Sequence, residues 1–328
     1  MHFLFCLRRL LSFRPRMVFA PWLAAGFIAL ALGGCAAPAS NPIAGTAVRL
    51  DETPRIAVMS AFEPELTLLL KQLQGPARHR LNGVDFTTGT LQGKPVVLFL
   101  SGISMVNASM NTQLALDRFN ITHIVFSGIA GGVNPALNIG DVAVPAQWGQ
   151  YLEVLIARET APGQFAIPPR MDAQTLAPFG MLHPRPVETR TAANPNPVRK
   201  FWFEVDSKML AVARGLGKVD LNHCSAGVCL THKPQLMLGG NGVSGQAFVD
   251  NTAFREYTFK TFQANVLDME TAAVGMMAYS NGVPYIAFRS LSDLAGGGKE
   301  ANEMVTFMNI AADNSAKVLL TFLAAWKS

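Results

Sequence analysis

The stretch RIAVMSAFEPELTLLLKQL, residues 55–73, decides the fold class of this chain. It begins with an unbroken apolar run, residues 56–59, which is typical of a strand buried on both faces. After Ser60 and Ala61 the pattern becomes helical. The apolar positions of that helical pattern are Leu66, Leu69, Leu70 and Leu73. A buried strand that leads directly into an amphipathic helix favours an α/β architecture.

The same alternation continues along the chain. Further strands are predicted at residues 95–102, 121–128, 141–146 and 284–293, and further helices at residues 106–119, 270–280 and 305–325. Apolar strands that alternate with helices indicate a sheet covered on both faces. We therefore predict one α/β domain over residues 55–328, without an internal linker or repeat. A chain of 328 residues that is 50% hydrophobic and 15% charged can bury a large core.

The middle of the chain, from about residue 147 to residue 234, has a different character. It carries many prolines and weak periodicity, except at FWFEVDSKMLAVARGLG (residues 201–217), which predicts one strand followed by a helix. We interpret this region as an elaborated connection that passes over the sheet and is a candidate lid.

The N-terminus has the composition of an export signal. Arginines precede an apolar run at residues 17–32, which is short for a membrane span and resembles the hydrophobic region of a signal peptide. The run ends in LGGC, residues 32–35, which resembles the bacterial lipobox, in which the cysteine is lipidated and begins the mature chain. An uncleaved N-terminal anchor is the alternative. In both cases we expect the remainder of the chain outside the cytoplasm.

We accordingly expect residues 1–34 to be a signal peptide and Cys35 to be the lipidation site. Residues 35–54 are predicted to be a tether, because residues 36–54 are rich in Ala, Pro, Asn and Ser and lack periodicity. By resemblance to known sorting signals, Ala36 after the cysteine favours the outer membrane, with the domain in the periplasm.

Most of the basic excess lies in that predicted signal. The chain has 27 Lys and Arg against 22 Asp and Glu, and removal of Arg8, Arg9, Arg14 and Arg16 with residues 1–34, which hold no acid, leaves 23 against 22. A net charge near +1 gives no electrostatic reason to expect nucleic acid as a partner.

Two cysteines lie within the predicted domain. Cys224 and Cys229 belong to NHCSAGVCLTHKP, residues 222–234, and an exported compartment permits a disulfide between them. Free thiols are one alternative, and a metal site with His223 and His232 is another. Because the spacing matches no known zinc pattern, we expect the disulfide and no bound metal.

Polar and glycine-rich segments follow the predicted strands. They are SGIS (residues 101–104), SGIAGGV (127–133), GNGVSGQAFVDN (240–251) and RSLSDLAGGG (289–298). Ligands bind beyond the carboxyl ends of strands in α/β sheets, and three carboxylates, Glu65, Glu270 and Asp293, are expected at that edge. Without metal-ligating histidines, they predict acid/base chemistry on a neutral substrate rich in hydroxyl groups.

Glu270 lies in NVLDMETAAVGMMAYSNGVP, residues 265–284. In a helix it would begin an otherwise apolar stripe. An unpaired buried charge is costly, so Glu270 is either solvated at the helix start or in contact with a polar ligand.

Six blocks of the sequence together resemble the nucleoside phosphorylase/nucleosidase superfamily. The blocks are RIAVMSAFEPEL, SGISMVNAS, VFSGIAGGVNPALNIGDVAVP, VSGQAFVDN, LDMETAAVGMMA and PYIAFRSLSDLA. Within the superfamily they are most similar to 5'-methylthioadenosine/S-adenosylhomocysteine nucleosidases. The resemblance implies a mixed central sheet flanked by helices, hydrolysis of the N-glycosidic bond of a purine ribonucleoside, no cofactor, and a homodimer.

The resemblance also implies roles for individual residues. Glu270 would hold the ribose 2' and 3' hydroxyls, and Met269 would pack against the sugar. Asp293 would protonate N7 of the departing purine. Glu65 would orient and deprotonate the attacking water, with Arg289 near that water.

The remaining implied contacts surround the base and the 5' substituent. Phe248 would stack on the base and the backbone of Val249 would meet its edge, while Phe62 and Met304 would line the 5' pocket. In the glycine block that contains Gly131, Ile129 departs from the hydroxyl residue that nucleosidases usually have.

Two other functions remain open at this point. Related phosphorylases carry an arginine just before the glycine block, where this chain has Phe126, and this difference favours water over phosphate. A nucleoside-binding or storage protein without turnover is the second alternative, since Ile129 departs from the nucleosidase pattern and the blocks also resemble plant vegetative storage proteins.

Overall fold

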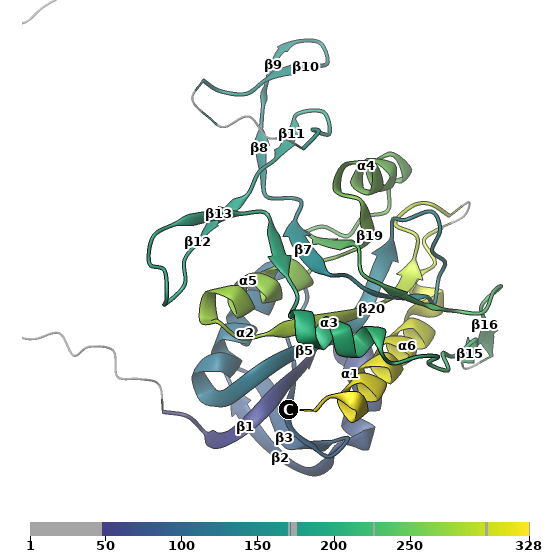
Figure 1. The fold of residues 1–328 in the computed structure, drawn as a ribbon. Helices are drawn as coiled ribbons and strands as arrows, with labels where there is room; N and C mark the ends of the chain where they lie inside the picture. The colour runs from purple at the N-terminus through teal and green to yellow at the C-terminus, as the bar shows by residue number, and fades with distance from the viewer. Residues whose placement is uncertain (1–47, 170, 172–175, 226, 299–300, 328) are drawn as a thin grey trace, which may run out of the picture. The chain divides into compact units, whose positions relative to one another are not determined.

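The apolar run at residues 56–59 lies in strand β1 (Asp51–Ser60), inside a large mixed sheet (Figure 1). The computed structural model describes residues 48–169, 171, 176–225, 227–298 and 301–327. These residues belong to one unit, which begins at Thr46. Cys35, the predicted signal peptide and most of the predicted tether lie outside the described residues.

The sheet of the described residues has one main path and one branch. From edge to edge the path runs β14 (Trp202–Glu204), β7 (Gln147–Gln150), β18 (Asn241–Ser244), β19 (Ala264–Asp268), β5 (Phe119–Gly132), β1, β4 (Lys94–Leu100), β3 (Val84–Leu91) and β2 (Gln74–Leu81). In the branch, β20 (Tyr285–Asp293) pairs with β5 and with β6 (Val142–Val144), and β6 pairs with β17 (Leu236–Leu238).

The direction of the central strands positions the site. Strands β4 and β5 run parallel to β1, and β20 runs parallel to β5. Strands β2, β3 and β4 are successively antiparallel, and β19 is antiparallel to β5. The carboxyl ends of β1, β4, β5 and β20 therefore reach the same edge of the sheet.

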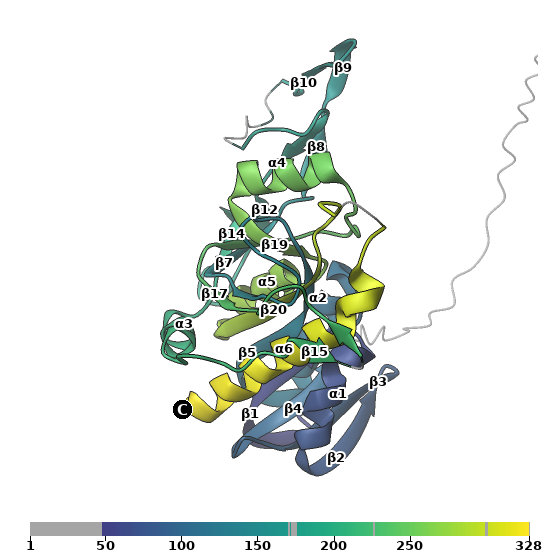
Figure 2. The same ribbon diagram turned by 90° about the vertical axis from the view of Figure 1, so that its right-hand side faces the viewer.

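Helices cover the central strands from both sides (Figures 1 and 2). The helices are α1 (Glu63–Gln72), α2 (Met105–Arg118), α3 (Ser207–Arg214), α4 (Thr252–Phe262), α5 (Thr271–Asn281) and α6 (Met304–Ala325). Helix α2 packs against α5, whereas α1 packs against α6. None of these helices, in the described part of the chain, combines the length and apolar character that a membrane span requires.

The predicted fold class, an α/β domain with a mixed sheet flanked by helices, is confirmed. Each predicted strand and helix is present, with ends that differ by a few residues. Strand β1 begins at Asp51, four residues before the predicted start of the domain, so the tether was predicted too long. The early start is stabilised by pairing of Asp51 with Phe119 of β5 and by an ion pair between Asp51 and Arg55.

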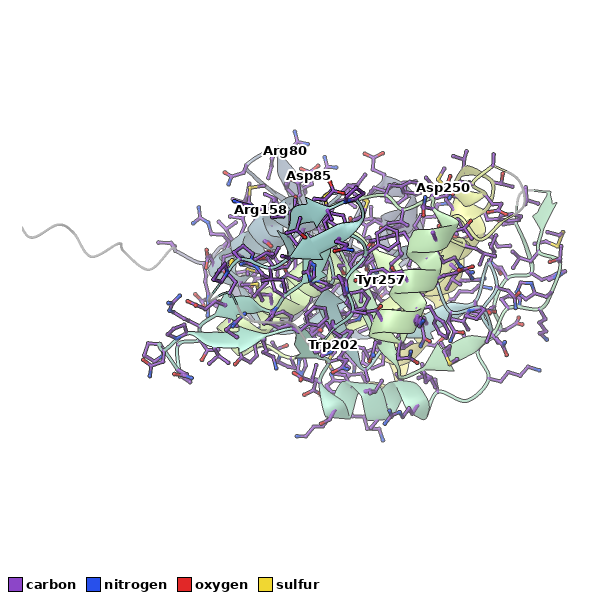
Figure 3. The ribbon with its side chains drawn as sticks, turned by 90° about the horizontal axis from the view of Figure 1, so that it is seen from above. Arg80, Asp85, Arg158, Trp202, Asp250 and Tyr257 are labelled. Atoms are coloured by element: carbon purple, nitrogen blue, oxygen red, sulfur yellow. A yellow bond between two sulfur atoms is a disulfide. The ribbon has the colours of Figure 1, made fainter. Side chains whose placement is uncertain are left out.

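The hairpin of β2 and β3 was not predicted. Its turn is Asn82-Gly83, with both residues at positive φ (48° and 80°), which is the common chemistry of a two-residue hairpin. Arg80 donates to Asp85 across the hairpin, from Nε to Oδ1 at 2.8 Å (Figure 3). The strand β2 is almost entirely exposed, so it lacks the apolar run on which the strand predictions depended.

The connection at residues 147–234 differs from its prediction as a segment that passes over the sheet. Its first strand, β7, lies inside the sheet between β14 and β18, where Trp148 packs directly against the backbone of Gly242. The predicted strand and helix within it are β14 and α3. Short antiparallel pairs outside the main sheet make up much of the rest, namely β8 (Val154–Ile156) with β11 (Leu182–Pro184), β9 (Arg158–Ala161) with β10 (Gln164–Ala166), and β12 (Val187–Thr189) with β13 (Val198–Lys200).

A fourth short antiparallel pair, formed by β15 (Cys224–Ser225) and β16 (Val228–Cys229), carries the two cysteines. Cys224 and Cys229 are disulfide-bonded to each other. Both are exposed, and neither lines the cavity described below.

Candidate active site

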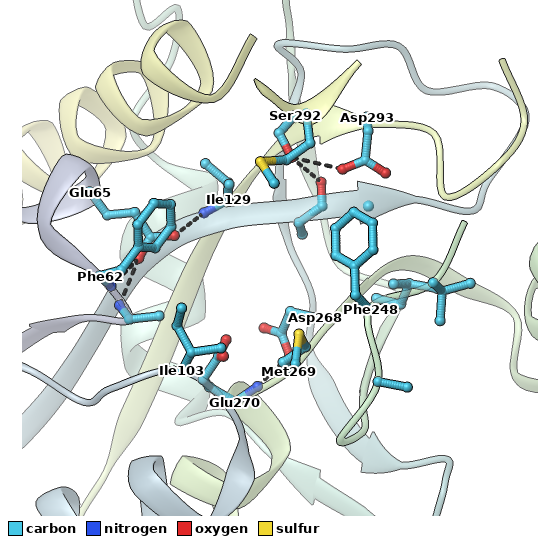
Figure 4. Close-up of a pocket in the computed structure, with 17 residues that line it drawn as sticks. Phe62, Glu65, Ile103, Ile129, Phe248, Asp268, Met269, Glu270, Ser292 and Asp293 are labelled. Carbon is cyan, nitrogen blue, oxygen red and sulfur yellow. Dashed lines mark hydrogen bonds between the residues drawn. The ribbon is translucent and has the colours of Figure 1, made fainter. Parts of the chain in front are cut away.

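A cavity of about 360 Å³ lies at the carboxyl ends of the central strands (Figure 4). This edge is where α/β sheets usually bind ligands. The lining residues are Ala61, Phe62 and Glu65 after β1, Ile103 after β4, residues 129–131 in β5, residues 247–249 after β18, residues 267–270 at the end of β19, Ser292 and Asp293 at the end of β20, and Met304 in α6.

Glu65 forms part of the cavity wall and is buried. Its Oε1 accepts the backbone N–H of Ile129 at 2.7 Å, and its Oε2 accepts those of Ala61 at 2.6 Å and Phe62 at 3.3 Å. The residue thus reaches back over the start of α1 as a capping side chain. Burial raises the pKa of Glu65, opposed by the charge of Arg289 and by these three N–H donors.

Glu270 begins α5 and is also buried, so its solvated alternative is excluded. Its Oε1 accepts the backbone N–H of Ser104 at 2.8 Å. Burial raises the pKa of Glu270 to about 8; Arg289 lowers it, whereas the neighbouring charges of Asp268 and Glu65 raise it further. A carboxyl group with this pKa can change protonation near neutral pH.

Asp293, the last residue of β20, also lines the cavity. Its Oδ1 accepts the backbone N–H of Ala295 at 2.8 Å and the amide of Asn302 at 3.4 Å, and its Oδ2 accepts the hydroxyl of Ser292 at 2.9 Å. Burial raises the pKa of Asp293, although these three donors oppose the rise. The next turn requires glycine, because Gly296 has φ of 87° and a Cβ there would lie 2.3 Å from the backbone nitrogen of Asn251.

Arg289 lies behind the cavity wall, with 0% of its surface exposed. Its Nη1 is 4.0 Å from Oε1 of Glu65, and its Nη2 is 3.6 Å from Oε2 of Glu270. The guanidinium lies over the ring of Phe126, with Cζ 4.0 Å from the ring centre. Gly128 makes room for this packing, because a Cβ there would lie 2.1 Å from Nη1 of Arg289.

A protein-family model described as the phosphorylase superfamily matches residues 55–324. The chain belongs to this superfamily. A 5'-methylthioadenosine/S-adenosylhomocysteine nucleosidase of Lysinibacillus sphaericus is 30% identical over 274 residues, which covers 83% of this chain and 99% of the relative. The nucleosidase of the same name from Bacillus pumilus is 27% identical over 274 residues, with coverages of 82% and 98%.

Solved structures of the superfamily share the fold. The 5'-methylthioadenosine/S-adenosylhomocysteine nucleosidase of Neisseria meningitidis in complex with methylthio-immucillin-A matches with a TM-score of 0.62 and 23% identity, over 83% of this chain and 99% of that one. Futalosine hydrolase of Helicobacter pylori matches with a TM-score of 0.61 and 23% identity, over 82% and 97%.

Most site residues named from the superfamily resemblance lie together. Those that line the cavity are Phe62, Glu65, Ile129, Gly131, Phe248, Val249, Met269, Glu270, Asp293 and Met304. Phe248 is 55% exposed, and its ring projects toward Asp293 (Figure 4). The resemblance places Arg289 beside the attacking water, but among the described residues Arg289 does not line the cavity and instead lies near Glu65 and Glu270 in its wall.

The interpretation of the connection as a lid stays a prediction. No described residue between 147 and 234 lines the cavity. Ile129 contributes its backbone N–H to Glu65, and its side chain offers no hydroxyl to a water molecule.

The sequence reasoning missed Asp268, Ser292 and Ile103. Asp268 ends a buried strand two residues before Glu270, a position that marks a residue at the ligand edge. Ser292 could have been predicted from its position as well, since it directly precedes Asp293 at the end of a buried strand. Ile103 lies in SGIS, one of the segments expected at this edge, but the residue itself was not singled out, because an apolar residue after a strand is equally common in a core.

Proposed function

We propose that this protein is a nucleosidase that hydrolyses the N-glycosidic bond of a purine ribonucleoside and releases the free base. The observation that carries the proposal is the cavity with Glu65, Glu270 and Asp293 in its wall and a buried arginine behind two of them. The relatives named as nucleosidases support the same reaction.

Each carboxyl group has a role in this reaction. The bond between C1' and the purine breaks, and its electron pair goes to the base, while Asp293 donates a proton to N7. Water then bonds to C1' and loses its proton to Glu65. General acid and general base catalysis each contribute about 10² to 10⁴-fold.

Glu270 is assigned to the ribose. A carboxylate that accepts the 2' and 3' hydroxyls also lies close to the ribosyl cation that forms when the bond breaks. Three buried carboxyl groups, Glu65, Asp268 and Glu270, lie close to the single guanidinium of Arg289. In their ionised forms these groups outnumber the single cation, and this favours a transition state that carries positive charge.

Water is the proposed acceptor in place of phosphate. A phosphate dianion requires cationic donors, but no lysine, arginine or histidine is among the described residues that line the cavity. Arg289 already contacts Asp268 and Thr271. An anion in the cavity would instead meet the carboxylates.

The proposed substrates are 5'-methylthioadenosine or S-adenosylhomocysteine. The support is the naming of the relatives and the apolar side chains of Phe62, Ile103 and Met304 in the wall, which suit a thioether at the 5' position.

Product analysis tests the reaction. We expect the purified domain to release free base from a purine nucleoside at the same rate with and without phosphate. The second product should be the free sugar, which is 5-methylthioribose when the substrate is 5'-methylthioadenosine. Phosphate-dependent release of sugar 1-phosphate would establish a phosphorylase instead. Tight binding of a nucleoside, without product from any nucleoside tested, would establish the storage alternative.

We further propose that lipid on Cys35 anchors the protein to a bacterial membrane, with the outer membrane preferred and the domain in the periplasm. The support is the arginine-rich start, the short apolar run and the LGGC motif of the sequence. The disulfide between Cys224 and Cys229 is of the kind that exported proteins keep.

A homodimer is also proposed. Ile103 lies just before α2 and is 52% exposed, and Val106 and Met110 lie on one face of α2 and are 66% and 50% exposed. An apolar face of this kind is suited to a protein interface. Because Ile103 also lines the cavity, a second copy on this face would cover part of the cavity mouth.

Native mass spectrometry of detergent-extracted protein checks both proposals in one measurement. We expect twice the mass of a chain that begins at Cys35 and carries added acyl groups. A chain that retains Met1 without acyl groups would contradict the anchor, and a monomer at every protein concentration would contradict the dimer.

A further inference from the structure

We infer that Asp268 is a positioning residue of this site, which holds Arg289 and the start of α5 so that Glu65 and Glu270 share the arginine. The inference concerns a residue that does not carry out any step of the proposed reaction. It rests on the proposed function for its effect on catalysis, although its effect on the carboxyl groups can be measured without turnover.

Asp268 is the last residue of β19 and is buried. Its Oδ1 accepts the hydroxyl of Ser244 and the backbone N–H groups of Glu270 at 3.2 Å and Thr271 at 3.1 Å. Its Oδ2 accepts the hydroxyl of Thr271 and lies 2.8 Å from Nε of Arg289. One carboxylate therefore joins β18, the first turn of α5 and β20.

These contacts fix the orientation of the guanidinium. Nε of Arg289 faces Asp268, and Nε and Nη2 donate to the hydroxyl of Thr271 at 3.0 and 2.8 Å. The ring of Phe126 covers one face of the guanidinium. Because Asp268 and Thr271 hold the side of the guanidinium that carries Nε, Nη1 faces Glu65 and Nη2 faces Glu270.

The distances show that Arg289 binds neither Glu65 nor Glu270 tightly. Glu65 lies 4.0 Å and Glu270 lies 3.6 Å from the arginine, both beyond hydrogen-bond length. A guanidinium that is free to turn would form a bidentate pair with one of them. Such a pair would occupy oxygens that the water and the ribose need.

The charges around Glu270 give a measurable consequence. The charged groups that act on it are Arg289 from β20, Asp268 from β19 and Glu65 from α1, and burial raises the pKa of Glu270 to about 8. Asp268→Asn removes one negative neighbour and frees the arginine. Both changes lower the pKa of Glu270, by about 1 to 3 pH units for a charge at this range.

Titration by ¹³C NMR with labelled glutamate tests the inference, with resonances assigned through Glu270→Gln and Glu65→Gln. In Asp268→Asn we expect Glu270 to titrate at lower pH, and kcat to fall by about 10²-fold with a smaller change in KM, since sub-ångström placement is lost. Thr271→Val is the second variant, in case Asp268→Asn does not fold. It removes the hydroxyl between Asp268 and Arg289 and should shift the pKa of Glu270 in the same direction.

Thr258→Val is the matched control. Thr258 is buried in α4 and bonds to the backbone of Phe254, so its loss destabilises the fold without reaching the cavity. We expect a lower Tm and an unchanged Glu270 titration. An unchanged Glu270 titration in both Asp268→Asn and Thr271→Val would overturn the inference. If the wild type releases no base, the proposed function fails, and the NMR titration still decides the role of Asp268.

Discussion

Replacement of Asp293 by asparagine is expected to lower kcat by about 10² to 10⁴-fold, the range of general acid catalysis. Asparagine keeps the shape and can still accept the N–H of Ala295 and contact Ser292, but it has no proton to transfer. Burial raises the pKa of Asp293, so the acid keeps its proton to a higher pH than a solvated aspartate. Activity of the wild type should fall as the pH rises through that pKa, and this limb should be absent from the variant.

The measurement is a pH profile of kcat with a purine nucleoside, together with the affinity for a non-hydrolysable analogue. Asp85→Asn is the matched control, because Asp85 lies on the β2/β3 hairpin in an exposed ion pair with Arg80 and outside the cavity. If Asp293→Asn keeps the wild-type kcat, Asp293 is not the general acid of the reaction. Altered affinity without any turnover in the wild type would support the storage alternative.

The second large effect is expected for Glu65→Gln, with kcat again lowered by about 10² to 10⁴-fold, because the amide cannot take the proton from water. Burial raises the pKa of Glu65, so wild-type activity should fall on acidification at a pH above the ordinary glutamate value of 4.5. The residual activity of the variant should lose that dependence.

The variant also has a predictable cost in stability. Both oxygens of Glu65 accept backbone N–H groups, and the amide nitrogen of glutamine would face one of them. An unpaired buried donor costs about 1 to 3 kcal/mol, so the Tm should fall and kcat must be measured well below it. Glu63→Gln in the same helix turn is the control, since Glu63 is exposed and does not line the cavity. Retention of wild-type kcat in Glu65→Gln would show that another group activates the water.

The local sequence pattern was sufficient to predict the central strands of the sheet but not the strands β2 and β7. Residues 56–59 predicted β1, because a strand buried on both faces leaves a continuous apolar run. Strand β2 has exposed residues along almost its whole length, and β7 lies in a proline-rich region. For β2, the Asn82-Gly83 turn is a local hairpin signal that the strand predictions did not use. For β7, the place in the sheet is decided by hydrogen bonds to β14 and β18, which are distant in sequence, so no local pattern encodes it.

The sequence by itself predicted that Glu65 and Asp293 reach the site, because both follow apolar strands and parallel strands end at one edge. Tertiary structure alone decided how they are charged and held. Arg289 joins groups that lie up to 224 positions away in the chain, and burial of the whole cluster raises the pKa of Glu270. Desolvation and charge pairing depend on distance in space, so the role of Asp268 emerged only when β18, β19, α5 and β20 were brought together.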